Sequence, residues 1–303
     1  MVKDARLSGY IFAILSALSV SLVYITSKII QRTMTIQVFL FWWFGLASLW
    51  AIVVLLVKRK DIACYVGKLK SFRYFFVYFV ISEATAAFLF FYVIGKINPA
   101  VVSFVGSITP LFVAVIAYFY ISEKLALREI FGGIVSVSGV ILITYVSPDI
   151  GIKYTLLVLS IVLVYSFNNV LIKKKTEDVP PLLITLVRIF FLFTTYTAYN
   201  LVLGGLRLPS PDEFVYLVAG SLLGPIFGMF FLFTALKSVK STQVSLIKNS
   251  QPFLVVIFSY IFLGTGITFS QLGAGSLIMI GISLMISDRR LNLRTLLNRF
   301  VKN

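Results

Sequence analysis

Long hydrophobic runs alternate with short polar segments along the whole chain. A helix needs about 20 mostly apolar residues to cross a bilayer. Ten runs reach this length, and they cover residues 7–30, 36–57, 72–95, 99–121, 125–146, 152–172, 181–203, 213–236, 241–263 and 267–286. Linkers such as KINPA and SPDIGIK leave room for little more than a turn, so neighbouring helices run antiparallel. The pattern predicts an all-α polytopic membrane protein with ten transmembrane helices.

The composition agrees with this pattern and excludes an ordinary soluble enzyme. Of the 303 residues, 59% are hydrophobic and 13% are charged, whereas soluble proteins carry about 25% charged residues. So few charges cannot cover a water-exposed surface, and most of the surface must therefore face the lipid bilayer.

The formal net charge of +16 is spread over short basic clusters between the apolar runs. An extended basic face with interleaved aromatic residues is missing, so we expect no nucleic-acid partner. If the N-terminus is cytoplasmic, the basic residues of the outer segments are Arg32, Lys96, Lys153 and Arg207. Because basic loops stay in the cytoplasm, we expect a multi-pass protein of the cell membrane with both termini cytoplasmic.

The residue types that most catalytic and metal sites use are scarce. The chain has no histidine and one cysteine, Cys64, which excludes an intrachain disulfide, a thiolate metal cluster and a histidine base. No nucleotide-binding loop of the GxxxxGK[ST] type is present, so the chain is not powered by an ATPase of its own. We expect no cofactor and no enzymatic activity.

A shift of 142 residues superimposes spans three to five on spans eight to ten. The shift aligns Ser103 with Ser245, Pro110 with Pro252 and Gly139 with Gly281, among other pairs. Five spans per unit is an odd number, so the two units enter the membrane from opposite sides, as in many secondary transporters. The chain is therefore expected to form two inverted five-helix repeats, residues 1–147 and 148–288, and a basic cytoplasmic tail, 289–303.

With these features the chain resembles the drug/metabolite transporter superfamily, in its EamA-type ten-helix branch. The stretch GSITPLFVAVIAYFYISEK carries the likeness, with Pro110 opening span four and Glu123 closing it. The stretch PPLLITLVRIF supplies Pro181 and Arg188, similar to the proline and arginine of the family's seventh span.

The chain departs from the family pattern where Thr265 replaces the second glutamate and where span two has no charge near Trp42. The resemblance implies transport of a small organic solute: an amino acid, a related metabolite or an amphipathic drug.

Two prolines interrupt spans at matching places in the two halves. Pro110 and Pro252 cannot donate to the carbonyls four residues earlier, which belong to Gly106 and Lys248. In lipid a bare carbonyl costs several kcal/mol, and paired helix breaks are the best sequence pointer to a transport site. The alternative is a structural kink.

Glu83 is the one acid well inside a predicted span. Charges there face an interior cavity and usually have a partner. Three roles are open: binding a substrate ammonium, carrying a coupling proton, or forming a fixed pair with a cation. A structural alternative is a protonated, hydrogen-bonded carboxyl group.

Further candidates for binding the solute are polar or aromatic residues of the spans. Lys248 and Arg188 can grip an acidic group, or they can snorkel towards the headgroups; Lys248 can also balance Glu83. The others are the polar residues Gln251, Ser245, Asn168 and Asn169 and the rings of Trp42, Tyr78 and Tyr92.

Small residues in span five (Gly132, Ser136 and Gly139) and span ten (Gly273, Gly275 and Gly281) are expected to pack helices together within the monomer. A dimer seam is the alternative, so a monomer and a homodimer both stay open.

The sequence thus favours a secondary transporter that moves its solute, with a coupling proton as an option, by alternating access. The alternatives are a passive channel and, far behind it, a membrane-embedded enzyme.

The predicted topology places Cys64, the single thiol, in a cytoplasmic loop. We therefore expect that a membrane-impermeant maleimide labels Cys64 in broken cells and leaves it unlabelled in intact cells. Labelling in intact cells would reverse the orientation.

Overall fold

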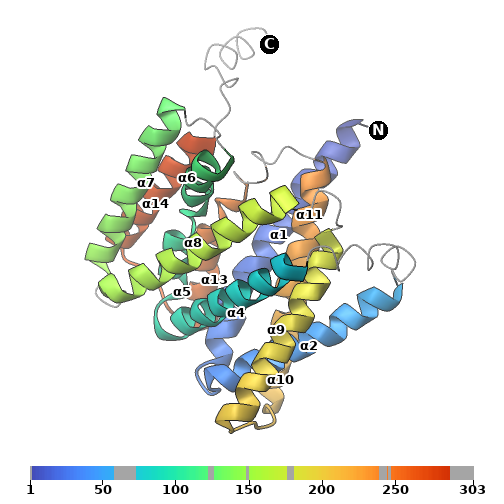
Figure 1. Cartoon of the computed structure of the whole chain (residues 1–303). Coiled ribbons are helices and arrows are strands. Elements are labelled where there is room, and N and C mark those ends of the chain that lie inside the picture. Colours follow the sequence, from blue (N-terminus) through green and yellow to red (C-terminus); the bar gives the residue numbers. More distant parts are fainter. Residues whose placement is uncertain are drawn as a thin grey trace.

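The computed structural model describes residues 2–57, 73–121, 126–147, 150–175, 181–238, 244 and 247–286, and nearly all of these residues are helical (Figure 1). The first half contains α1 (Val2–Ile30), α2 (Ile36–Val57), α4 (Arg73–Lys96), α5 (Pro99–Gly106), α6 (Thr109–Ile121) and α7 (Leu127–Val146). The second half contains α8 (Gly151–Lys175), α9 (Pro181–Leu203), α10 (Pro211–Ser221), η1 (Leu222–Gly228), α11 (Met229–Ser238), α13 (Gln251–Leu263) and α14 (Phe269–Ile286).

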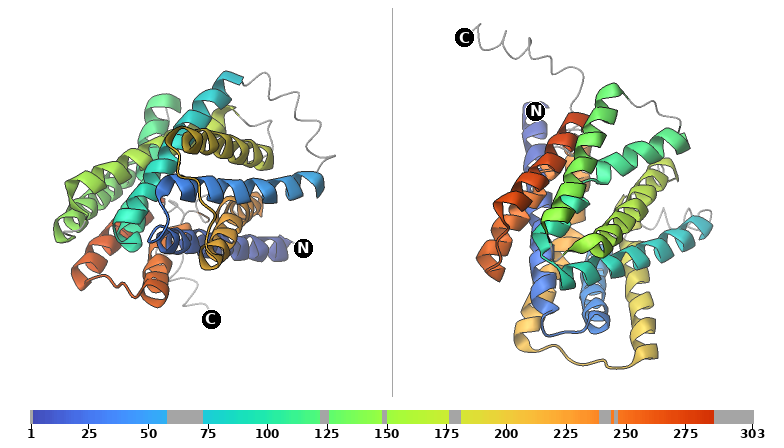
Figure 2. Two further views of the ribbon diagram at one scale, coloured as in Figure 1. Left: turned by 90° about the horizontal axis from the view of Figure 1, so that it is seen from below. Right: turned by 90° about the vertical axis from the view of Figure 1, so that its left-hand side faces the viewer.

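The helices confirm the predicted spans. Nine stretches within the described residues are long and apolar enough to cross a membrane. The remaining predicted span, 241–263, is represented by the shorter helix α13, and part of it lies outside the described residues. Span four consists of α5 and α6, and span eight consists of α10, η1 and α11. α1 begins and α14 ends on the same side of the molecule, as ten crossings require (Figures 1 and 2).

Local sequence explains where several helices begin and end. The Asn98 side chain accepts a hydrogen bond from the Ala100 amide at 2.9 Å, ahead of α5. Ser210 and Glu213 cap the start of α10 by bonding to each other's backbone amides. These are the residue types that satisfy free amides in a first helical turn. α13 ends at Gly264, whose φ of 65° is the left-handed conformation that glycine adopts readily.

The two halves are interrupted at the same repeat position. Span four breaks at residues 107–108, between α5 and α6, and the start of span nine breaks at residues 249–250, just before α13. A shift of 142 residues, which the sequence predicts for the repeat, relates the two breaks. The structure thus places both breaks in the predicted register, each two residues ahead of a proline.

α7 and α14 lie against each other as a close antiparallel seam (Figure 2). A Cβ atom on Gly132 would lie 2.5 Å from the Gly281 carbonyl oxygen, and one on Gly139 would lie 3.0 Å from the Ala274 carbonyl oxygen. The repeat shift relates these two approaches to each other. The Ser136 hydroxyl donates to the Ile278 carbonyl at 3.2 Å, and these two residues are themselves 142 positions apart.

The seam answers the question that the glycines raised in the sequence. Gly132, Gly139 and Gly281 are used within the chain, as predicted, and Gly275 lies against the ring of Phe104. Gly273 has open space around it. Gly132, Gly139 and Gly281 of spans five and ten are therefore packed against each other within the chain.

The two halves interlock through equivalent helices (Figure 1). α1, the first span of its half, packs along α10, η1 and α11, which form the third span of the other half. In the same way, α8 packs against α4. α2 packs against α9, which joins the second spans. No boundary surface separates two independent bundles, so residues from both halves meet in the interior.

Span eight contains a π-helical segment that the sequence analysis did not predict. η1 includes Pro225, which has no amide hydrogen to donate. The glycines at 220, 224 and 228 face α1 and Trp43, and a Cβ atom on Gly220 would collide with the Trp43 ring. The wider π turn therefore combines a missing backbone donor with a close helix approach.

Gly281 offers a direct test of the seam. Gly281→Ala would place a methyl group against Ser136 and the Gly132 carbonyl, and overpacking of this kind costs about 1–3 kcal/mol. We expect a lower unfolding temperature in detergent. Gly273→Ala adds the same methyl group where there is space, so it should leave the unfolding temperature unchanged or raised. Equal unfolding temperatures for the two variants would contradict the seam.

Candidate functional site

An ion pair joins the two halves inside the membrane region. Glu83 of α4 and Arg188 of α9 lie 2.5 Å apart, measured from carboxylate Oε2 to guanidinium Nε. The Glu83 side chain is 6% exposed, whereas that of Arg188 is 18% exposed. Of the three roles that the sequence leaves open for Glu83, the geometry matches the fixed pair with a cation.

Asn168 of α8 completes the surroundings of the carboxylate. Its Nδ2 donates to Oε1 of Glu83 at 2.9 Å, and its Oδ1 accepts from the Ser82 hydroxyl at 3.0 Å. Both carboxylate oxygens therefore accept a strong hydrogen bond. A buried ion pair is stable only with such additional bonds, because desolvation opposes the Coulomb attraction.

Two tyrosines flank the pair. The hydroxyl of Tyr165 on α8 lies within hydrogen-bonding reach of the Arg188 guanidinium. The Tyr196 hydroxyl donates to the Ala84 carbonyl at 2.7 Å, which ties α9 to α4 beside the pair. Neither tyrosine was singled out in the sequence analysis. For Tyr196, the spacing of eight residues from Arg188, about two helical turns, was the available signal.

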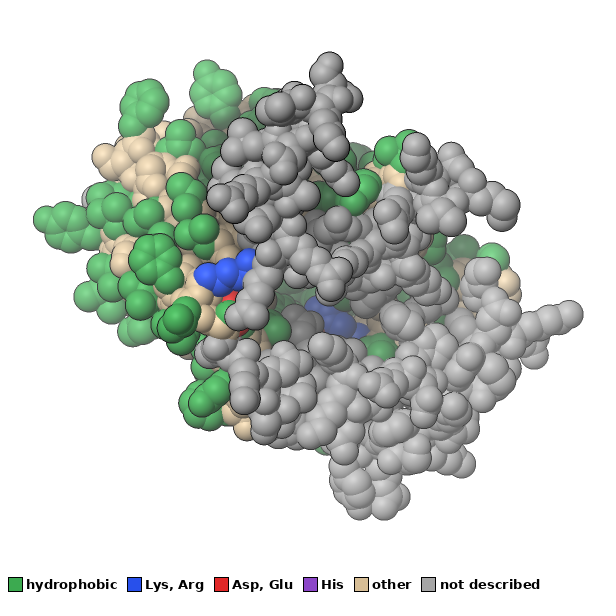
Figure 3. Space-filling model, turned by 90° about the horizontal axis from the view of Figure 1, so that it is seen from above, with side chains coloured by type: hydrophobic (Ala, Val, Ile, Leu, Met, Phe, Trp, Pro, Cys, Tyr) green, Lys and Arg blue, Asp and Glu red, His purple; other side chains and the backbone are tan. Residues whose placement is uncertain are grey.

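The members of this cluster share one depth. Glu83 lies ten residues after the start of α4, Arg188 seven after the start of α9, and Asn168 seven before the end of α8. At 1.5 Å per residue they are about 10–15 Å from the side on which α1 begins. Figure 3 shows that side: hydrophobic side chains dominate the described surface, and basic side chains are recessed within it.

The residues predicted around Pro252 form a separate group. Lys248 is half-buried and makes no hydrogen bond or ion pair with any described residue. The backbone carbonyl of Gln251 accepts from the Ser21 hydroxyl of α1 at 3.4 Å. The expectation that Lys248 balances the charge of Glu83 is wrong, because Arg188 is the ion-pair partner of Glu83. Ser245 and the side chain of Asn169 lie outside the described residues.

The helix breaks differ from expectation in one respect. The Gly106 carbonyl was expected to be free, and this is wrong because the Thr109 hydroxyl donates to it at 2.7 Å. Pro110 therefore interrupts the helix without leaving that acceptor bare. Pro252 lies in the first turn of α13, where a missing amide hydrogen costs nothing. The hydroxyl of Tyr24, from α1, approaches Gly106 and Ser103 at the break in span four.

Among the predicted aromatic candidates, Trp42 and Tyr92 contact residues other than the ion pair, whereas Tyr78 lies next to Ser82, which donates to Asn168. Trp42 donates from Nε1 to the Arg207 carbonyl at 2.9 Å, at the far end of the molecule. Tyr78 is 44% exposed and packs edge-on against Phe167. Tyr92 stacks on Phe88, with the Lys96 ammonium over its ring.

Polar contacts hold the two halves together on the opposite side from the cluster. The Arg207 guanidinium pairs with Glu213 at 2.6 Å and donates to the Thr33 carbonyl at 3.1 Å. The hydrogen bond to the Glu213 carboxylate raises the pKa of the Arg207 side chain above its usual value.

Three further contacts close this outer face. The Asn98 amide donates to the Gly266 carbonyl at 3.1 Å, and Gln271 donates to Ser147 at 3.0 Å. Lys28 donates to the carbonyls of Gly95 and Ile97.

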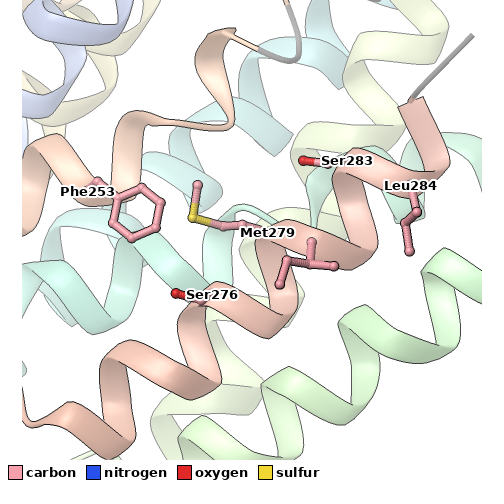
Figure 4. Close-up of a pocket in the computed structure, with 6 residues that line it drawn as sticks. Phe253, Ser276, Met279, Ser283 and Leu284 are labelled. Carbon is pink, nitrogen blue, oxygen red and sulfur yellow. The ribbon is translucent and has the colours of Figure 1, made fainter. Parts of the chain in front are cut away.

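The two best-formed cavities are apolar and separate from the ion pair. One, of about 490 Å³, lies between α13 and α14; Phe253 and Met279 face each other across it, with Ser276 and Ser283 along α14 (Figure 4). The other, of about 580 Å³, is lined by Ile108 in the break of span four and by residues of α6, α7 and α8. Neither includes Glu83, Arg188 or Lys248. Among the described residues no cluster of His, Cys, Asp and Glu is suited to a metal ion.

Asn168 gives a test of how the carboxylate is held. Asn168→Ala removes the hydrogen bond to Oε1 of Glu83, and bonds to charged groups contribute about 1.5–3 kcal/mol. We expect a clear fall in unfolding temperature in detergent. The control is Ser160→Ala on the same helix, where the hydroxyl is exposed and bonds only to its own helix. Equal unfolding temperatures for the two variants would mean that Asn168 does not support Glu83.

Comparison with known proteins identifies the fold and the family of this chain. A solved crystal structure aligns over 99% of both chains with a TM-score of 0.62 and 18% identity, which shows a shared fold. No curated protein sequence matches the chain. The model of the EamA-like transporter family matches residues 7–145 and again 152–287, one match for each five-helix half. The chain therefore belongs to the EamA-like transporter family, as a multi-pass membrane protein built from two inverted repeats.

Proposed function

We propose that this protein is a secondary transporter that moves a small organic solute across the cell membrane by alternating access. The observation that carries the proposal is the Glu83–Arg188 pair, which joins a helix of one repeat to a helix of the other. An ion pair in hydrocarbon is expensive and typically marks a solute or ion pathway. Membership of a transporter family supports the same reading.

In this proposal the solute enters from the side on which α1 begins and reaches the cluster of Glu83, Arg188 and Asn168. The outer contacts of Arg207, Glu213 and Thr33 keep the other side closed in this state. Transport requires these contacts to separate while the inner side closes. From the basic loops we infer that the side with α1's start is cytoplasmic.

Other candidate residues have supporting roles in the proposal. Lys248 and Gln251, beside the break that precedes α13, contribute to the inner part of the solute site, together with Ser245 and Asn169. Trp42 belongs to the outer contacts, since it binds the loop that carries Arg207. Tyr78 and Tyr92 have contacts that packing alone explains.

Solute exchange in liposomes tests the transporter class. Purified protein is reconstituted with one solute inside, and the uptake of the labelled solute is followed; phenylalanine is the first probe, followed by a panel of amino acids and amphipathic drugs. A transporter gives saturable uptake that unlabelled internal solute accelerates, whereas a passive channel gives neither. Uptake that stays linear with concentration for every probe would contradict the proposal.

Glu83→Gln tests whether the ion pair belongs to the transport cycle. The variant keeps the shape of the side chain and removes its charge. The ion pair between α4 and α9 is then lost, and with it the electrostatic control of the movement of these two helices. We expect exchange to slow by about tenfold or more, which corresponds to about 1.4 kcal/mol. The control is Lys153→Gln, which removes an exposed charge at the start of α8. Normal exchange by well-folded Glu83→Gln protein would remove the pair from the mechanism.

A further inference from the structure

The guanidinium of Arg188 has unused hydrogen-bonding capacity in the interior of the protein. An arginine carries five N–H donors. Only Nε is bonded to Glu83, and Tyr165 is within reach of the group. The Arg188 side chain is 18% exposed. Guanidinium donors that Glu83 does not use can therefore reach an external acceptor.

Glu83, in contrast, has little left to offer a ligand. Its two oxygens accept from Arg188 and Asn168, and its side chain is a third as exposed as that of Arg188. A substrate ammonium would have to displace one of these donors and reach a nearly buried carboxylate. The arrangement therefore presents a positive group to the interior space and keeps the negative group behind it.

The charges of the candidate residues near the inner side also indicate that the site presents a positive charge to the solute. Lys248 is a second basic side chain on that side, and no described residue pairs with it. Counting only Glu83, Arg188 and Lys248, the basic side chains outnumber the acidic one by one. An excess of one matches a carboxylate, which carries one negative charge, better than a phosphate group, which carries close to two.

We propose that Arg188 is the anchoring group for a carboxylate of the solute, and that Glu83 and Asn168 are positioning residues that hold the guanidinium. The planar donor fork of arginine matches the two oxygens of a carboxylate. The Tyr165 hydroxyl lies beside the guanidinium and donates to the same solute carboxylate. The inference rests on the proposed transport function and defines its substrate class as small organic acids and zwitterions with an exposed carboxylate.

Binding to the purified protein tests this class without transport. The probes are phenylacetate and phenylacetamide, which share a ring and differ in charge, together with phenyl phosphate. We expect phenylacetate to raise the unfolding temperature in detergent in a saturable way, and phenylacetamide and phenyl phosphate to bind about tenfold or more weakly. Stronger binding of the amide or of the phosphate ester would overturn the proposal.

Three variants identify the anchoring residue. Arg188→Lys keeps the charge and the pairing with Glu83 but removes the fork, so phenylacetate affinity should fall by about tenfold or more. Arg128→Lys, at the start of α7, is the matched control and should bind normally, since Arg128 is neither the partner of Glu83 nor part of the proposed site. Glu83→Gln keeps an amide oxygen that can accept from Nε and so still orients the guanidinium, but it removes the competing negative charge. Phenylacetate affinity should therefore increase, whereas a site that grips an ammonium would lose affinity for phenylethylamine. Loss of phenylacetate binding in folded Glu83→Gln protein, or normal binding in Arg188→Lys, would refute the assignment.

The exchange assay separates this inference from the proposed function. If the protein exchanges neutral or cationic solutes equally well whether or not they carry a carboxylate, the proposed transport function is supported and the carboxylate site is refuted. If saturable exchange is absent for every solute while phenylacetate still binds at Arg188, the binding site stands and the transport function fails.

Discussion

The interaction on which the interior of this protein depends is the ion pair between Glu83 and Arg188. Two charges within a bilayer-spanning fold are tolerated only when they neutralise each other and when their remaining hydrogen-bonding groups are satisfied. Asn168 and Ser82 meet this demand on the side of the carboxylate. The pair also decides which helices are neighbours, because α4 and α9 belong to different repeats and the Tyr196 hydroxyl joins them again one helical position away, at Ala84.

The repeat gives the fold two kinds of contact. Along α7 and α14 small residues let the backbones meet directly, and the contact is tight and antiparallel. Around α4, α8 and α9 the contacts are polar, and the Arg188 side chain is partly exposed. Rigid packing on one side of the molecule and exchangeable polar contacts on the other are what a protein needs if only part of it rearranges. The outer contacts of Arg207 and Glu213 are of the exchangeable kind.

Much of the architecture could be predicted because the bilayer imposes it. Hydrocarbon thickness determines helix length, so the spans were readable as apolar runs, and Pro110 and Pro252 marked the breaks. The partner of Glu83 could not be predicted, since Arg188 is 105 residues away and Lys248 was an equal candidate by charge. The Gly106 carbonyl was misjudged because a local hydroxyl, that of Thr109, satisfies it. The π segment was missed because Pro225 lies in an apolar run whose pattern still fits a plain helix.

The hydrogen bond between Ser136 and Ile278 has a geometric meaning. Its two residues are equivalents in the repeat, so the pseudo-twofold axis relating the halves passes between α7 and α14. If each half adopts the conformation of the other, the face that was open becomes the face that is closed. Points on the axis map onto themselves in that exchange. Under the proposed alternating access, the α7–α14 contact would therefore stay in place while the rest of the two halves exchange conformations.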